Sequence, residues 1–188
     1  MKKKAIWMVL AAVVLVVASV GGTIAYLTST PAALTNTFTV GKVAETLTEP
    51  TWSGDGADHQ LVPGKVLTKD PKVTVLAGSE KAYVFIKVTA TADVKAVLTY
   101  SVDTTVWTSY SGDVYYRVVD KSTSDTVLSV LTSNQITVKT TAVAAELNAL
   151  TSGSILKVSS AAVQFDNVKG TAPQTDLDAA YAIISGNL

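Results

Sequence analysis

The order of apolar and polar residues divides the chain into an apolar leader and a longer part with short-range alternation. The leader is the apolar stretch Ala5–Val20, which only Ser19 interrupts. From Leu34 onward, the chain contains short segments in which apolar and polar side chains alternate. Their period of two residues is that of a β-strand with one buried face. We predict strands at residues 34–43, 72–78, 81–91, 94–102, 113–120, 125–133, 135–141 and 154–165.

Turn-forming residues separate the predicted strands. Residues 46–71 contain three of the five prolines, and we interpret this segment as loops. Within it, Pro63-Gly64 has the composition of a tight turn, with proline at the first central position and glycine at the second. By contrast, Tyr83–Val88 is almost continuously apolar, which predicts a strand that is buried on both faces.

Two short segments have helical rather than strand character. Ala142–Gly153 is rich in alanine and leucine and closes on a glycine. Thr175–Ile183 begins with a suitable N-cap, Thr175, followed by two aspartates that the helix dipole favours. The predicted fold class is therefore mainly β: a jelly-roll-like antiparallel β-sandwich with two short helices.

The N-terminus has the three parts of a secretory signal peptide. Lys2–Lys4 precede the apolar stretch, and a glycine pair follows it. Thr23 and Ala25 are small enough for the −3 and −1 positions of a signal peptidase site, so that cleavage would leave Tyr26 first; Ala18 is an alternative last residue. An uncleaved membrane anchor is the competing interpretation, but the apolar stretch is 16 residues long, short of the ~20 that span a bilayer.

These features predict three segments. Residues 1–25 form the signal peptide, residues 26–37 an N-terminal arm, and residues 38–188 a single β-sandwich domain. Pro31 has no N–H for a strand ladder, so the arm is at best an edge or irregular strand. The signal peptide predicts that the domain is secreted.

Composition removes several classes of function. The chain has 15 basic and 15 acidic residues, with Arg117 as its one arginine. Because no basic cluster follows the first four residues, we predict no nucleic-acid partner. The absence of cysteine excludes disulfide scaffolds, thiol nucleophiles and thiolate metal sites.

Six short motifs lie in order along nearly the whole chain. They are GTIAYLTSTPAALTNTFTVGKV, LTEP, LVPGKVLTKDPKVTV, YVFIKV, AAVQFDNV and DAAYAII. No one of them is decisive, but in this order and spacing the chain resembles the TasA/camelysin family, whose members are secreted through a SipW-type signal peptidase.

The resemblance implies a secreted jelly-roll subunit that polymerises into extracellular fibres of a biofilm matrix or cell surface. Its partners would be copies of itself joined head to tail, the SipW-type peptidase, and matrix or cell-wall components. In such fibres the arm of one subunit enters the next as a strand, the donor-strand mode. The candidate assembly residues are Tyr26, Leu27, Pro31, Leu34 and Phe38. For Phe38, a place in the first strand of its own domain is the favoured alternative.

Two alternative functions are a monomeric surface-binding module and a camelysin-like metalloprotease. A zinc protease needs several nitrogen or carboxylate ligands, commonly from H-E-x-x-H on a helix, whereas this chain has one histidine, His59. It also lacks the G-x-S-x-G turn of a serine hydrolase. We predict a chain that is not an enzyme, with no catalytic residue, metal or cofactor. The surrounding loop, Ser53–Gln60, is interpreted as solvated rather than as a calcium site.

Two residue groups have both a structural and a functional interpretation. The aromatic residues Trp107, Tyr110, Tyr115 and Tyr116 could form a sugar-binding platform, but alternating aromatics in hairpins are more typical of cross-strand packing. Lys69 and Asp70 are interpreted as an exposed local charge pair at a strand entry, which contributes only ~0–1 kcal/mol.

Overall fold

The computed structural model describes residues 42–51, 60–150, 155–166, 168–170 and 175–188. The chain divides into two units, Met1–Thr39 and Val40–Leu188, and every described residue belongs to the second unit. The signal peptide, the arm, most of the first predicted strand and His59 lie outside the described residues. The cleavage and assembly candidates outside them are Thr23, Ala25, Tyr26, Leu27, Pro31, Leu34 and Phe38.

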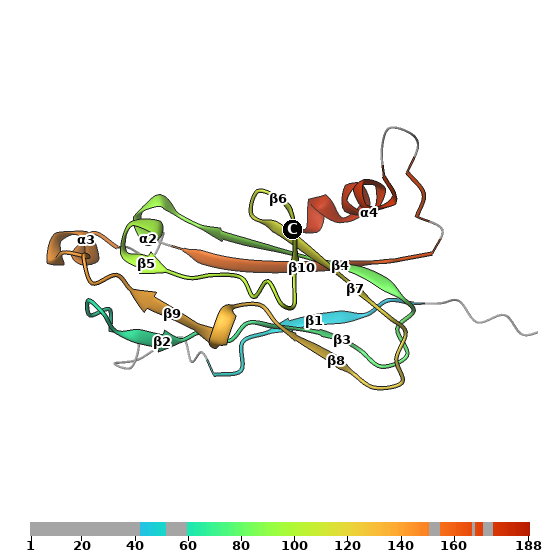
Figure 1. Cartoon of the computed structure of the whole chain (residues 1–188), viewed down its shortest axis with the longest axis horizontal. Helices are drawn as coiled ribbons and strands as arrows, with labels where there is room; N and C mark the ends of the chain where they lie inside the picture. The colour runs from blue at the N-terminus through green and yellow to red at the C-terminus, as the bar shows by residue number, and fades with distance from the viewer. Residues whose placement is uncertain (1–41, 52–59, 151–154, 167, 171–174) are drawn as a thin grey trace, which may run out of the picture. The chain divides into compact units, whose positions relative to one another are not determined.

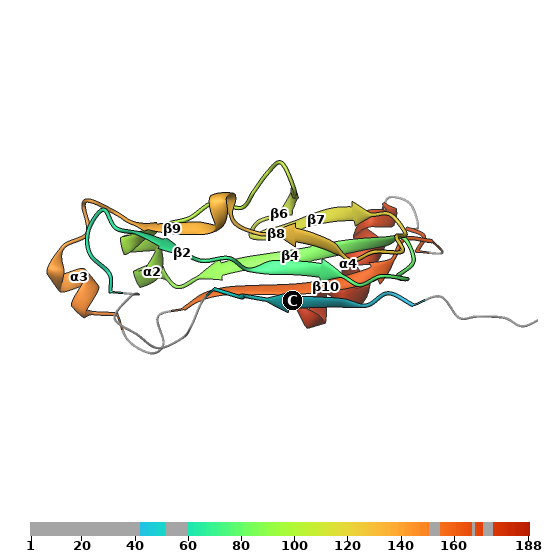
Figure 2. The same cartoon turned by 90° about the horizontal axis from the view of Figure 1, so that it is seen from below.

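Among the described residues, ten strands form three antiparallel sheets. The four-stranded sheet consists, in spatial order, of β10 (Leu156–Gln164), β4 (Ala82–Ala90), β7 (Val114–Val119) and β6 (Thr108–Ser111). The two three-stranded sheets are β1 (Glu45–Thr48), β3 (Lys72–Val75) and β8 (Thr126–Ser129), and β2 (Val66–Thr68), β9 (Gln135–Val138) and β5 (Leu98–Thr99). The four-stranded sheet forms one layer, and the sheet β1-β3-β8 lies below it as the other (Figures 1 and 2). The predicted mainly-β antiparallel sandwich is confirmed.

The main hydrophobic cluster lies between the two layers. Strand β4 contributes Val84, Ile86 and Val88, which alternate along the strand and are all buried. Val73 of β3 and Leu128 of β8 face them from the other layer. This alternation is what a sheet with one face against a core requires.

A second cluster lies on the other face of the four-stranded sheet. Tyr83 and Phe85 of β4 are buried there against helix α4 (Asp176–Ile184), which contributes Ala180 and Ile184. Figure 1 shows α4 above this sheet. Strand β4 therefore has a hydrophobic layer on each side, which confirms the prediction of double-sided burial.

The helices depart partly from the prediction. Helix α4 begins as predicted, because Thr175 Oγ1 accepts a hydrogen bond from the Asp178 N–H at 3.1 Å. Helix α3 (Ala144–Asn148) is shorter than its predicted segment. The prediction of a strand at 94–102 is wrong over its first half, which belongs to a third helix, α2 (Ala92–Val97). The helix buries Val94 and Val97, three residues apart on one face.

The interpretation of residues 46–71 as loops is also wrong in part. Strands β1 and β2 lie within or at the edge of this segment. Both are short, and three of the four β1 residues are exposed, so the chain shows no apolar alternation there. The predicted turn is confirmed: Gly64 has φ +83°, and the Lys65 N–H donates to the Val62 carbonyl at 2.9 Å.

Candidate functional site

Two edge strands lie on the same side of the sandwich. Among the described strands, β1 pairs only with β3, and β10 pairs only with β4. The two edges run alongside each other, one in each layer (Figures 1 and 2). A single side-chain hydrogen bond among the described residues joins them, from Ser160 Oγ to Glu45 Oε2 at 2.8 Å.

The backbone of β10 presents polar groups to this edge. Its odd-numbered residues bond to β4, since the Phe165 N–H donates to the Lys81 carbonyl at 2.8 Å and the Ile155 carbonyl accepts from Thr91 at 3.0 Å. In an antiparallel strand the intervening residues point their N–H and C=O groups the other way. Leu156 and Val158 therefore direct theirs away from β4, at the open edge of the four-stranded sheet.

The backbone of β1 does the same from the opposite side. The Leu76 N–H donates to the Ala44 carbonyl at 2.9 Å, and Thr46 lies opposite Thr74, so even-numbered residues bond to β3. Glu45 and Leu47 therefore point their backbone groups away from β3. Among the described residues, both strands therefore leave ladder positions without a backbone partner, at edges that lie on the same side of the sandwich.

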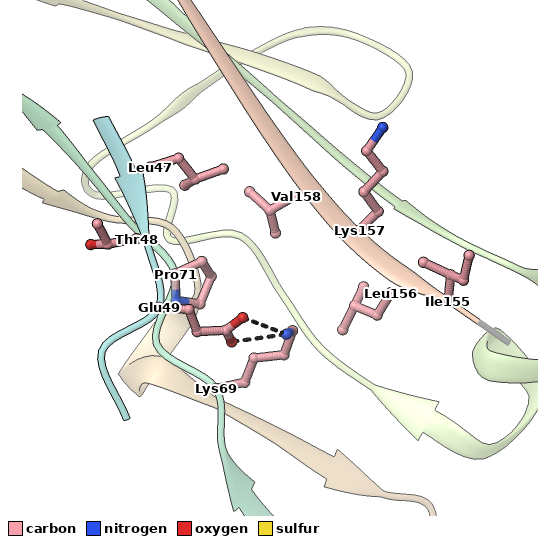
Figure 3. Close-up of a pocket in the computed structure, with 9 residues that line it drawn as sticks. All are labelled: Leu47, Thr48, Glu49, Lys69, Pro71, Ile155, Leu156, Lys157 and Val158. Carbon is pink, nitrogen blue, oxygen red and sulfur yellow. Dashed lines mark hydrogen bonds and ion pairs between the residues drawn. The ribbon is translucent and has the colours of Figure 1, made fainter. Parts of the chain in front are cut away.

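A groove of approximately 350 Å³ opens between these edges. It is lined by Leu47, Thr48, Glu49, Lys69, Pro71, Ile155, Leu156, Lys157 and Val158. Figure 3 shows Leu156 and Val158 pointing from β10 into the groove and Lys157 pointing away. Leu47 and Ile155 are 36% and 49% exposed. Apolar side chains and free backbone edges therefore lie together.

Two charged residues close one end of the groove. Lys69 is buried, and its Nζ contacts the two carboxylate oxygens of Glu49 at 2.8 and 3.0 Å. Figure 3 shows this pair at the foot of the groove. Glu49 directly follows β1, and Lys69 directly follows β2. The pair therefore fixes the end of β1 to the sheet β2-β9-β5.

Asp70 anchors the same end of β1. Its Oδ1 accepts hydrogen bonds from the Thr51 N–H at 3.0 Å and from Thr51 Oγ1 at 2.6 Å, and its Oδ2 lies 3.5 Å from Lys72 Nζ. Burial raises the pKa of Asp70, but the hydrogen bonds from Thr51 and the nearby Lys72 outweigh it, so the pKa lies below its usual value.

The interpretation of Lys69 and Asp70 as an exposed pair is therefore wrong. Both are buried, and each bonds to residues near the end of β1 rather than to the other. A sequence signal was available: the segments LTEP and LTKDP, 20 residues apart, carry opposite charges at the matching positions of Glu49 and Lys69.

The aromatic residues do not form a binding platform. Trp107 is 1% exposed, and its Nε1 donates to the Ser129 carbonyl at 2.8 Å. Tyr110 and Tyr116 pack in the cluster beneath α4, and Tyr115 packs against the main cluster. Burial and a 2.7 Å hydrogen bond to Asp178 raise the pKa of Tyr110 to about 12. The packing interpretation is confirmed.

The described residues contain neither a cluster of metal-ligating side chains nor a membrane-spanning helix. Within them, no three histidine, cysteine, aspartate or glutamate side chains gather as metal ligands. No helix in the same ranges has the length and apolarity to cross a membrane. His59 and the predicted solvated loop around it lie outside these ranges.

Comparison with known proteins gives no assignment. No protein-family model, no curated protein and no solved structure matches the chain. The TasA/camelysin resemblance stays a prediction from the motifs. The groove between β1 and β10 is the structural feature that bears on function.

Proposed function

We propose that the chain is a secreted structural subunit that polymerises into extracellular fibres, and that the groove between β1 and β10 receives a strand from a second copy. The observation that carries the proposal is the pair of edge strands that border one groove. An edge strand leaves a row of unpaired N–H and C=O groups. Here Leu47 and Val158 supply such groups from both sides of one groove.

The occupant that we propose is the N-terminal arm of another copy, residues 26–37. The arm precedes the sandwich unit and carries apolar side chains at Leu27 and Leu34. These side chains would cover Leu47, which lines the groove and is 36% exposed. Fully covering an aliphatic side chain contributes about 1.5–3 kcal/mol.

Strand donation between different surfaces gives an open chain of subunits. The donor is the arm and the acceptor is the groove, so each copy offers one of each. Such a head-to-tail contact generates filaments where the rotation between copies does not close a ring. Signal peptidase cleavage after Ala25 would free the arm to enter a neighbour.

Deleting the arm is the first test. We expect filaments from the chain that begins at Tyr26 and monomers from the chain that begins at Asn36, as measured by negative-stain electron microscopy at matched concentrations. If the two chains assemble equally, or if both stay monomeric at high concentration, strand donation by the arm is wrong. Circular dichroism of both chains distinguishes lost assembly from lost folding.

Blocking the groove is the matching test on the acceptor side. Leu47→Asp is expected to raise the concentration needed for filaments by at least about tenfold, because Leu47 points into the groove (Figure 3) and a carboxylate there would be covered without a partner. Val127→Asp is the control, since Val127 is 57% exposed on β8, outside the residues that line the groove. Sedimentation of filaments measures both. Equal effects of the two substitutions would contradict a specific acceptor groove.

A further inference from the structure

The groove does not extend along the whole space between the two edge strands. It is lined on β10 by residues up to Val158. Two residues further along the same face, Ser160 Oγ donates to the Glu45 carboxylate at 2.8 Å. Ser160 and Glu45 are both half-buried. Among the described residues this is the one hydrogen bond between β1 and β10, and we call it the latch.

The latch limits the length of strand that fits. The stretch Ile155–Val158 is four residues long, which corresponds to about 13 Å of extended chain at ~3.3 Å per residue. The proposed donor arm has twelve residues, 26–37. Beyond Val158 the hydrogen-bonded side-chain pair fills the space between β1 and β10, so the side chains of a docked strand cannot enter there while the bond is intact.

The rest of β1 is held on the side away from β10. The Ala44 N–H donates to Ser79 Oγ at 3.2 Å, before the strand begins. Glu49 bonds to Lys69 after the strand ends, where both residues line the groove and close its other end. The latch alone must break for the groove to lengthen past Val158.

We propose that the Ser160–Glu45 hydrogen bond is an autoinhibitory latch, which keeps the acceptor groove short in the free subunit and opens when a full donor strand enters. This inference rests on the proposed function. It assigns regulation to the same groove: the first residues of the arm dock beside Leu156, and the latch breaks when further residues of the arm extend along β10 past Val158. Long strands that do not displace the latch are thereby kept out.

Removing the latch donor tests the proposal. In the chain that begins at Tyr26, Ser160→Ala is expected to shorten the lag before filament growth about three- to tenfold, which is the order of effect of one ordinary half-buried hydrogen bond. Ser159→Ala is the control, because its side chain lies on the opposite face of β10. Glu45→Gln retains an acceptor oxygen and is expected to behave like the unchanged chain. Light scattering follows the growth.

The experimental outcomes distinguish a wrong latch proposal from a wrong strand-donation proposal. If the unchanged chain assembles and Ser160→Ala has an unchanged lag, the latch is wrong and strand donation stands. If the unchanged chain does not assemble, strand donation fails, and amide hydrogen exchange decides the latch. The Thr46 amide bonds to β3, and we expect it to exchange several-fold faster in the Ser160→Ala monomer. Equal exchange in both chains would overturn the latch.

Discussion

Trp107→Ala is expected to destabilise the sandwich by about 3–5 kcal/mol, because it leaves a large cavity between the layers. Trp107 is 1% exposed and is the largest of the fully buried side chains in the described part of the chain. It precedes β6 of one sheet, while its Nε1 donates to Ser129 of β8 in the other. The substitution removes contacts to both layers at once. Urea unfolding followed by circular dichroism measures the loss.

Trp107→Phe separates the ring from its hydrogen bond. It retains most of the apolar volume but leaves the Ser129 carbonyl without the indole donor. We expect a smaller loss of about 1–3 kcal/mol. If Trp107→Ala lowered the free energy of unfolding no more than Trp107→Phe, the Trp107 ring would not be a packing centre between the layers. A binding role for this side chain would then have to be reconsidered.

Much of the sandwich follows from local sequence. Strand β4 and its double-sided burial are readable from the apolar run Tyr83–Val88, and the start of α4 from Thr175. Helix α2 is not readable, because Val94 and Val97 favour strands by intrinsic propensity. Their burial in the main cluster is what stabilises the helical spacing, and that tertiary packing overrides propensity.

The groove could not be predicted from the sequence, for a different reason. Alternation predicts that a segment is a strand, but not which strand lies beside it. That β1 and β10 are edges on the same side depends on pairings across the whole domain. Register, which distant contacts set, decides which residues of each strand point their backbone groups out of the sheet. The charged pair Lys69–Glu49 was visible only as two similar motifs of opposite charge.

Asp70→Asn is expected to destabilise the domain by about 1.5–3 kcal/mol at neutral pH, since the carboxylate accepts two hydrogen bonds from Thr51 while almost wholly buried. Asparagine keeps the shape but loses the charge that faces Lys72. The end of β1 is then held less firmly, so the groove wall is also expected to be more mobile. Thermal unfolding at pH 7 measures the first effect.

The pH dependence gives Asp70→Asn a second, independent readout. The folded-state pKa of Asp70 lies below the usual value of 3.8, so its carboxylate contributes stability above about pH 4, which is lost as the pH falls through the folded pKa. The difference in stability between the unchanged chain and Asp70→Asn should therefore shrink in acid. Asp120→Asn is the control, because its side chain is 84% exposed beside Lys81. A constant difference from pH 7 to pH 2 would contradict the assignment of the anchor to the ionised carboxylate.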